Sequence, residues 1–168
     1  MTALDDAQWL AAVRIDDEVS ALQPGYRALV MTVSGLAGGP TDAGSDALLA
    51  AAEARAAELA ADAAVDALPH VTQWREAYRS FGAKPQRTRP SVEALLRRCP
   101  DGLPRIDRIT DVYNAVSVAH VVPIGGEDLS AYAGPARLVR ARGDEPFEAT
   151  AQGQPVIEHP DAGEVVWR

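Results

Sequence analysis

The chain has 168 residues, of which 47% are hydrophobic, so it is long and apolar enough for one folded domain or two tightly packed halves, and disorder is excluded. Its formal net charge of −8 discourages non-specific binding to nucleic acids. No apolar run reaches the length of a transmembrane helix, and the N-terminus has acidic residues where a signal peptide has basic ones. The chain has one cysteine, Cys99, so it cannot form an internal disulfide. From these three features we expect a cytoplasmic protein.

The first half of the chain contains a predicted strand, a loop and a long helix. Residues 26–34 are apolar and β-branched and follow a Pro-Gly turn signal, which predicts a buried strand. The glycine-rich residues 35–45 are expected to form a loop. Residues 46–68 are rich in alanine without Gly or Pro, so they predict a helix with Ser45 as its N-cap and a following proline as its stop.

Two shorter helices are predicted on either side of a stiff loop. Residues 70–82 have apolar side chains at three- and four-residue spacing, which predicts an amphipathic helix that ends at Gly82. Residues 83–90 contain two prolines and are expected to be extended. Ser91 is the predicted cap of a helix over residues 92–99.

The remaining third begins with an ambiguous segment. Residues 105–120 are rich in Val and Ile, which favours a strand, but their apolar side chains recur at i, i+3, i+4 and i+7, which favours a helix. We predict the helix, with an apolar stripe of Ile109, Val112, Tyr113 and Val116. Residues 121–134 are rich in turn signals, residues 136–142 alternate as a strand does, and residues 143–168 predict two or more short strands.

Positive charge is concentrated in one part of this acidic chain. Residues 79–108 contain eight basic and three acidic residues, a net charge of +5, which leaves −13 for the remainder. The basic residues are Arg79, Lys84, Arg87, Arg89, Arg97, Arg98, Arg105 and Arg108. Such a segment either binds an anionic partner in one orientation or is a solvated surface whose arginines pair with nearby acids. The charge pattern leaves both alternatives open.

The sequence contains no strong catalytic motif. A nucleophile elbow, a P-loop and a Rossmann glycine fingerprint are all absent. His70, His120 and His159 are far apart and near no cysteine at ligand spacing, so we expect neither a metal nor a cofactor. Cys99 lies at a predicted helix end before a proline and is expected to be an inert structural thiol.

Two weaker features remain open. Gly125 and Gly126 permit close approach of the backbone to a ligand and offer free N–H donors, but an ordinary turn has the same composition. Asn114 is a polar amide among apolar neighbours, and such a group is either hydrogen-bonded within the fold or in contact with a ligand.

Five segments in the second half of the chain occur in the same order as in a known protein family. They are PSVEALLRR, DVYNAVS, PIGGEDL, GPARLVRARGDEPF and GEVVWR. They resemble the B3/B4 domain of the bacterial phenylalanyl-tRNA synthetase beta subunit. They are more similar still to free-standing B3/B4 proteins, which carry W-R-E-A-Y-R-x-F-G-x-K-P, R-P-S-x-E-A-L-x-R-R and D-x-Y-N-A-V-S. The resemblance covers about Trp74 to Arg168.

The resemblance implies an α/β (α+β) fold in which helices pack on a mixed β-sheet, and a single B3/B4-like domain over residues 1–168. The free-standing relatives usually continue past G-E-V-V with a Trp-Asn-Trp-Arg segment, whereas this sequence ends at Arg168. The expectation is therefore a shortened member of the family or a fragment, in which an edge strand could be missing.

The resemblance also implies a site, because in the synthetase this domain hydrolyses mischarged tyrosyl-tRNA. A pocket for the aminoacyl-adenosine end of tRNA is therefore expected. The expected catalytic residues are Asn114, Asp128 and Glu164, and the expected substrate-binding residues are Asp111, Ser117, Gly125 and Gly126. The expected contacts to tRNA phosphates are Arg79, Lys84, Arg87, Arg89, Arg97 and Arg98. Two synthetase editing residues are not matched, since Gly125 replaces a histidine and Gln154-Pro155 replaces a glutamate.

Three functions are compatible with these observations. The first is a tRNA-binding protein that hydrolyses mischarged aminoacyl-tRNA in trans. The second is a non-catalytic module that binds tRNA or a free amino acid, so enzymatic activity stays open. The third is an interaction domain without a role in RNA binding. No membrane partner is expected, and no oligomeric state follows from the sequence.

Overall fold

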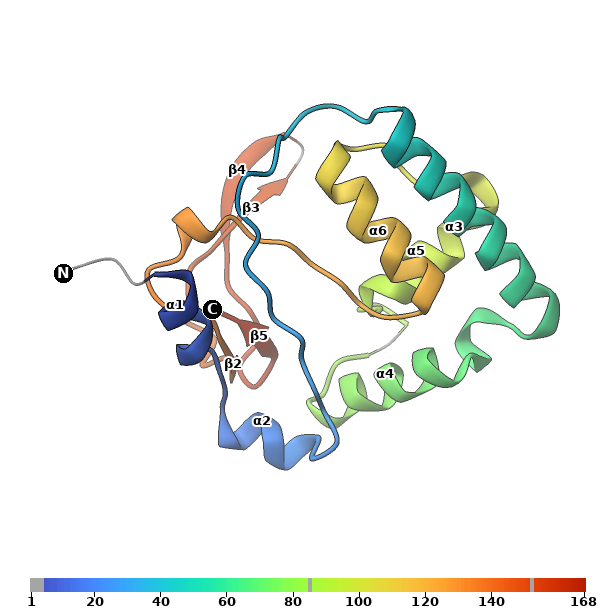
Figure 1. The fold of residues 1–168 in the computed structure, drawn as a ribbon. Helices are drawn as coiled ribbons and strands as arrows, with labels where there is room; N and C mark the ends of the chain where they lie inside the picture. The colour runs from blue at the N-terminus through green and yellow to red at the C-terminus, as the bar shows by residue number, and fades with distance from the viewer. Residues whose placement is uncertain (1–4, 85, 152) are drawn as a thin grey trace. The chain divides into compact units, whose positions relative to one another are not determined.

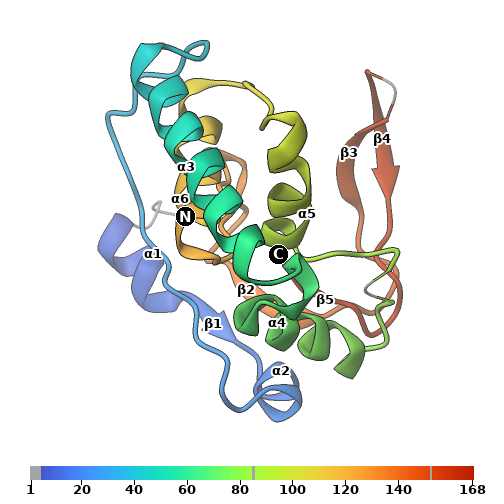
Figure 2. The same cartoon turned by 90° about the vertical axis from the view of Figure 1, so that its right-hand side faces the viewer.

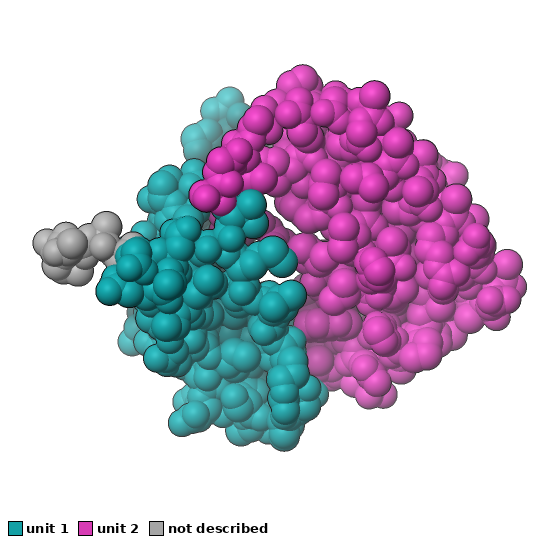
Figure 3. Space-filling view, in the orientation of Figure 1, with its two compact units in different colours: residues 1–33, 80–83, 128–168 teal, residues 34–79, 84–127 magenta. Residues whose placement is uncertain are grey.

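The computed structural model describes residues 5–84, 86–151 and 153–168 (Figures 1 and 2). These residues form six α-helices, three short 3₁₀ helices and five strands, which confirms the expected α+β fold with a mixed sheet. The chain divides into two compact units (Figure 3). Unit 1 comprises residues 1–33, 80–83 and 128–168, and unit 2 comprises residues 34–79 and 84–127.

Unit 1 contains a three-stranded sheet with the strand order β1-β2-β5. The edge strand β1 (Arg14–Ile15) pairs in parallel with β2 (Arg137–Arg140), and β2 pairs antiparallel with β5 (Val165–Trp167). Two short helices flank β1 in the sequence, α1 (Asp6–Ala12) and α2 (Asp17–Leu22). The sheet therefore joins the first and the last segments of unit 1.

The last segment of unit 1 also forms a separate hairpin of β3 (Phe147–Ala151) and β4 (Gln154–Glu158). With β2 and β5, this hairpin confirms the strand predicted in residues 136–142 and the short strands predicted in residues 143–168. The elements α1, β1 and α2 were not predicted, because helices of six or seven residues contain too few turns to show a clear apolar period.

The prediction of a buried strand over residues 26–34 was wrong. The segment alternates as a strand does: Leu29, Met31 and Val33 are 87%, 66% and 58% exposed, while Val30 lines an open pocket of about 340 Å³ within unit 1. No described residue forms a strand ladder with this segment. An alternating pattern makes a strand only where a neighbouring backbone accepts and donates its hydrogen bonds.

Unit 2 is helical, and its helices are α3 (Ala43–Asp62), α4 (Pro69–Ser80), α5 (Ser91–Arg98) and α6 (Arg108–His120). All four predicted helices are confirmed, although α3 ends six residues early and is followed by a 3₁₀ turn. Helix α3 lies along α6 (Figures 1 and 2). The core of the unit consists of Leu49, Ala52, Ala56, Leu68, Val71, Val92, Leu96, Cys99, Leu103, Ala115 and Val118. The side chains that α3 contributes to this core are mostly small, which allows α3 and α6 to approach closely.

Two predicted helix caps were wrong. The N-cap of α3 is Asp42, whose carboxylate accepts the N–H groups of Gly44 and Ser45 at 2.9 Å each. The Ser45 hydroxyl accepts the Asp42 N–H in return at 3.1 Å, so the two residues form a capping box. Helix α5 begins at Ser91 itself, with Pro90 before it and no side-chain cap. A carboxylate that reaches two N–H groups satisfies the α3 end better than one hydroxyl would.

Candidate functional site

Helix α6 buries its polar edge rather than its apolar stripe. Asp111, Asn114 and Ser117 are all buried, whereas Val112 and Val116 of the predicted stripe are 37% and 41% exposed. The spacing correctly predicted a helix over this segment, but the face that packs inward in unit 2 carries these polar side chains beside Ala115 and Val118 of the core, and not the predicted stripe. These three buried polar side chains are therefore the first place to look for a site.

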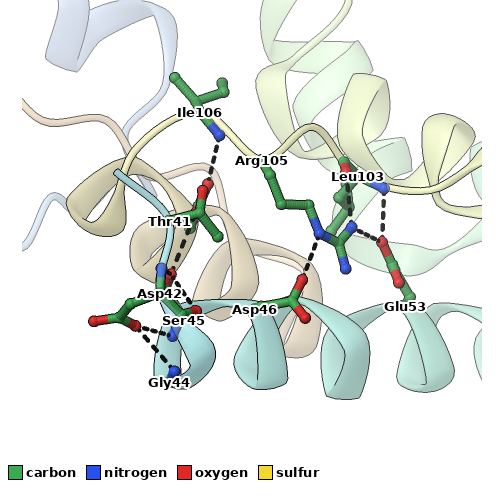
Figure 4. A network of polar contacts seen from close by, with 10 residues as sticks. Thr41, Asp42, Gly44, Ser45, Asp46, Glu53, Leu103, Arg105 and Ile106 are labelled. Carbon is green, nitrogen blue, oxygen red and sulfur yellow. Dashed lines mark hydrogen bonds and ion pairs between the residues drawn. The ribbon is translucent and has the colours of Figure 1, made fainter. Parts of the chain in front are cut away.

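The Asp111 carboxylate binds only groups of its own chain among the described residues. Its Oδ2 accepts the Thr41 hydroxyl at 2.6 Å and the Ser45 hydroxyl at 3.3 Å, and its Oδ1 accepts the Ile106 N–H at 2.9 Å (Figure 4). The carboxylate therefore connects α6 to the start of α3 and to the segment before α6. We assign it to positioning rather than to direct contact with a ligand.

Ser117 fixes the end of α6. Its hydroxyl donates to the Val122 carbonyl at 2.6 Å, and the helix stops at Val121, which has φ 53° and ψ 47°. A β-branched residue seldom adopts this left-handed conformation, so the end of the helix is locally strained. The His70 ring nitrogen Nδ1 lies 3.2 Å from the Val121 carbonyl. These contacts set where the loop that contains Gly125 and Gly126 begins.

Asn114 differs from its two buried neighbours because its amide has no hydrogen-bond partner among the described residues. Its residue is 8% exposed, so the unused donors and acceptor are nearly buried. In the following loop, a Cβ atom at Gly126 would lie 3.4 Å from the Tyr113 ring, and a Cβ at Gly125 would meet nothing within 4 Å. Unit 2 therefore holds Asn114 and Tyr113 on α6, and in the following loop Gly125 with open space around it and Gly126 against the Tyr113 ring. No sequence pattern had indicated Tyr113 as a site residue.

The carboxylates of Asp128 and Glu164 belong to unit 1. Asp128 accepts the Ser130 hydroxyl at 2.8 Å and the Ser130 N–H at 2.9 Å, and these hydrogen bonds hold its pKa below the ordinary value. It is therefore ionised at neutral pH and acts only as an acceptor. Glu164 accepts the Asp161 N–H at 3.2 Å in the turn before β5. Both carboxylates have local partners within unit 1.

The eight basic residues of the positive segment divide into two groups of four. Four are close to acids of unit 2: Arg89 and Arg97 at Glu93, Arg105 at Asp46 and Glu53, and Arg108 at Asp42. The other four, Arg79, Lys84, Arg87 and Arg98, are exposed and have no ion pair with any residue that the structure describes. Local ion pairs therefore involve half of the segment, and the other four cationic groups carry no ion pair with a described residue.

Arg105 is the most firmly held of the paired arginines (Figure 4). Its Nη1 lies 2.6 Å from Glu53 Oε1 and its Nε lies 2.8 Å from Asp46 Oδ1. Glu53 also accepts the Leu103 N–H at 2.7 Å, and its pKa is lowered chiefly by the hydrogen bond from Arg105. This network attaches α3 to the segment before α6, and it leaves Arg105 unsuited to binding a partner.

Burial makes the Cys99 thiol unreactive, as the sequence predicts. Desolvation, with a smaller effect from the Glu53 charge, raises the pKa of this thiol to about 11. The reactive thiolate should therefore be about 100-fold scarcer than in the unfolded chain at pH 8. We expect a thiol reagent to modify the native protein roughly in that proportion more slowly than the urea-unfolded protein. Equal rates in the two states would show that Cys99 is accessible.

No metal-binding group of three or more His, Cys, Asp or Glu side chains occurs among residues 5–84, 86–151 and 153–168. Within the same described part of the chain, every helix is too short or too polar to cross a membrane.

Comparison with known protein families identifies a domain in the second part of the chain. The family model of the B3/4 domain matches residues 73–168, which is more than half of the chain and draws residues from both units. No curated protein and no solved structure matches the chain.

Proposed function

Because the chain belongs to the B3/4 domain family, we propose that it is a tRNA-binding protein that hydrolyses mischarged aminoacyl-tRNA in trans. Membership of this family implies nucleic-acid binding of a tRNA-related kind. The choice of an aminoacyl-tRNA as the ligand, and of hydrolysis as the reaction, is finer than this family match and rests on the resemblance to the synthetase editing domain.

The observation that carries RNA binding is the set of four exposed, unpaired cations on an acidic chain. Arg79, Lys84, Arg87 and Arg98 all belong to unit 2, and none is neutralised by a described acid. Phosphate oxygens are the natural partners of such groups. The net charge of −8 on the whole chain repels a polyanion elsewhere, so it orients the RNA toward this segment.

The proposed reaction site in unit 2 consists of Asn114 and the Gly125-Gly126 pair. The free Asn114 amide would hold the aminoacylated ribose, and the two glycine N–H groups would donate to the oxyanion that forms on the ester carbonyl. Water adds to that carbonyl, the bond from the carbonyl carbon to the ribose oxygen breaks, and the ribose oxygen takes a proton. Asp128 and Glu164 of unit 1 stay proposed catalytic carboxylates on the resemblance alone.

A non-catalytic binding module is the second candidate, and a specific observation favours it. The synthetase histidine and glutamate are replaced by Gly125 and by Gln154-Pro155, so neither side chain is available for editing. Under this alternative Asn114 would bind the 3′ end or a free amino acid without turnover. Deacylation assays on a panel of aminoacyl-tRNAs separate the two: the proposed enzyme hydrolyses at least one of them above the spontaneous rate, and Asn114→Ala abolishes that excess.

Removing two of the free cations should reduce the salt dependence of tRNA binding. For Lys84→Ala with Arg87→Ala, the slope of log K against log salt should become shallower by about two, because each cation neutralises one phosphate. Filter binding or fluorescence anisotropy over a range of salt concentrations measures the slope.

Arg55→Ala is the matched control for this double variant, because Arg55 lies on α3 outside the positive segment and pairs with Glu58. It should leave the slope unchanged. An unchanged slope for Lys84→Ala with Arg87→Ala, in a protein that still binds tRNA, would remove this segment from the interface and favour the interaction-domain alternative.

A further inference from the structure

Three arginines from different elements of unit 2 converge on one buried carboxylate. Glu93 in the first turn of α5 has no exposed surface. Its Oε1 lies 2.9 Å from Arg97 Nε, 3.2 Å from Arg75 Nη1 and 3.9 Å from Arg89 Nε. Arg75 comes from α4, Arg89 from the loop before α5, and Arg97 from the last turn of α5. The carboxylate therefore sets the spacing of three guanidinium groups.

The cluster retains an excess of positive charge. Asp66 is the other acid within it and lies 3.4 Å from both Arg75 Nη1 and Arg97 Nη2. These distances are longer than those of strong charge-assisted hydrogen bonds. Three arginines against two carboxylates leave one unit of positive charge, and the second acid holds its partners only loosely.

Stability alone gives a poor account of Glu93. Its Oε2 is buried and has no hydrogen-bond partner among the described residues, so half of the carboxylate is desolvated without compensation. A buried ion pair is often replaced by apolar side chains at no loss of stability. A carboxylate kept here at that cost is better explained by what it does to the arginines around it.

Two of the three arginines still present donors to solvent. The side chains of Arg89 and Arg97 are 46% and 40% exposed, whereas that of Arg75 is 14% exposed. Arg97 uses Nε and Nη2 in the cluster, and no described residue accepts from its Nη1 or from either Nη of Arg89. Guanidinium groups have donors only, so these nitrogens need an external acceptor.

We propose that Arg89 and Arg97 form a fork for a single phosphate group, and that Glu93 is the positioning residue that holds the fork in place. This proposal rests on the proposed tRNA-binding function and assigns one backbone phosphate to a defined subsite. Glu93 offsets the mutual repulsion of the guanidinium groups, holds Arg97 by a hydrogen bond of 2.9 Å and attracts Arg89 at 3.9 Å, which lowers the entropy lost on binding. A phosphate then accepts from Arg97 Nη1 and from the Arg89 Nη groups, the nitrogens from which no described residue accepts.

For Glu93→Gln, the proposal predicts a change in tRNA affinity opposite to the one that charge alone would give. Glu93→Gln removes a negative charge from a site for a polyanion, so simple electrostatics predicts tighter binding. The positioning role predicts weaker binding, by about three- to tenfold, because the neutral amide no longer offsets the repulsion between the guanidinium groups and holds them together less firmly. Arg89→Lys keeps the charge and removes the fork, so it should weaken binding by a similar factor at an unchanged salt slope.

The experiment measures tRNA affinity and its salt slope by fluorescence anisotropy for the full chain and both variants. Glu58→Gln on α3 makes the same change of net charge at an exposed residue, and Arg55→Lys is the corresponding arginine control. Neither control should weaken binding. Circular dichroism confirms that each variant is folded, and Arg89→Lys decides the question if Glu93→Gln does not fold, because Arg89 makes no hydrogen bond within the described cluster.

The outcomes separate this inference from the function on which it rests. Weaker binding by both variants, with unaffected controls, supports the fork. Tighter or unchanged binding by folded Glu93→Gln, or unchanged binding by Arg89→Lys, overturns the fork and leaves tRNA binding intact. A wild-type protein that binds no tRNA overturns the proposed function. In that case titration with inorganic phosphate, followed by NMR, tests the subsite by itself. Shifts of the Arg89 and Arg97 side-chain signals support the subsite, and the absence of such shifts overturns it as well.

Discussion

Asp111→Ala should lower the free energy of unfolding by about 3 kcal/mol, because it removes the shared acceptor of three hydrogen bonds and leaves two of the donors without another one. Those donors are the hydroxyls of Thr41 and Ser45 and the N–H of Ile106. They come from the start of α3 and from the segment before α6, and of the three only the Ser45 hydroxyl has a second acceptor, the Asp42 carbonyl at 3.3 Å. Urea denaturation followed by circular dichroism measures the loss.

Asp62→Ala is the matched control for Asp111→Ala, since Asp62 is exposed at the last residue of α3. It should change the free energy of unfolding by no more than about 0.5 kcal/mol. The loss for Asp111→Asn should lie between those for the other two variants. Its amide oxygen still accepts one hydrogen bond, but its NH₂ group is a donor and faces groups that also donate. A loss below about 1 kcal/mol for Asp111→Ala would mean that water replaces the carboxylate at this position.

Glu93→Leu is the second change with a large expected effect, a loss of about 3–5 kcal/mol, because it removes one partner of a buried ion pair. The charge of Arg75 is the one left least compensated, since its side chain is only 14% exposed and Glu93 is its nearest acid. Adding Arg75→Met should restore much of the loss, because an apolar pair of similar volume then fills the same space. A double-mutant cycle by urea denaturation gives the coupling between the two residues.

The exposed pair of Arg55 and Glu58 on α3 provides the comparison for that cycle. Its N–O distance is 2.8 Å, shorter than that of Arg75 and Glu93, but both side chains face solvent. Its coupling should not exceed about 0.5 kcal/mol, since water screens the charges. Equal coupling for the two pairs would show that burial is not what makes the Glu93 interaction large.

The helices of unit 2 were predictable from local pattern, and the strand at residues 26–34 was not. A helix satisfies its own backbone hydrogen bonds, so spacing and composition within one segment are enough to predict it. A strand depends on a neighbouring backbone that its own residues do not specify. The cap of α3 was misplaced for a related reason, because Asp42 and Ser45 both suit an N-cap and only geometry shows that the first takes the role.

The candidate site was predictable only in part. The resemblance pointed to Asn114 and the glycine pair, and the structure adds that this amide lacks an internal partner. Glu93 was not predicted, because an acid in the first turn of a helix is already explained by the helix dipole. Its burial depends on Arg75 of α4 and on Asp66, which lie 18 and 27 residues earlier in the chain.

The outward row of Leu29, Met31 and Val33 has a consequence for the behaviour of concentrated solutions. Between Arg27 and Asp42 the chain carries no charge, so nothing on this segment acts as a gatekeeper against stacking of one molecule on another. Colloidal repulsion from the remaining acidic surface has to provide that protection. It weakens as the pH falls toward the isoelectric point and as salt screens it, so mildly acidic, salty buffers are where precipitation begins.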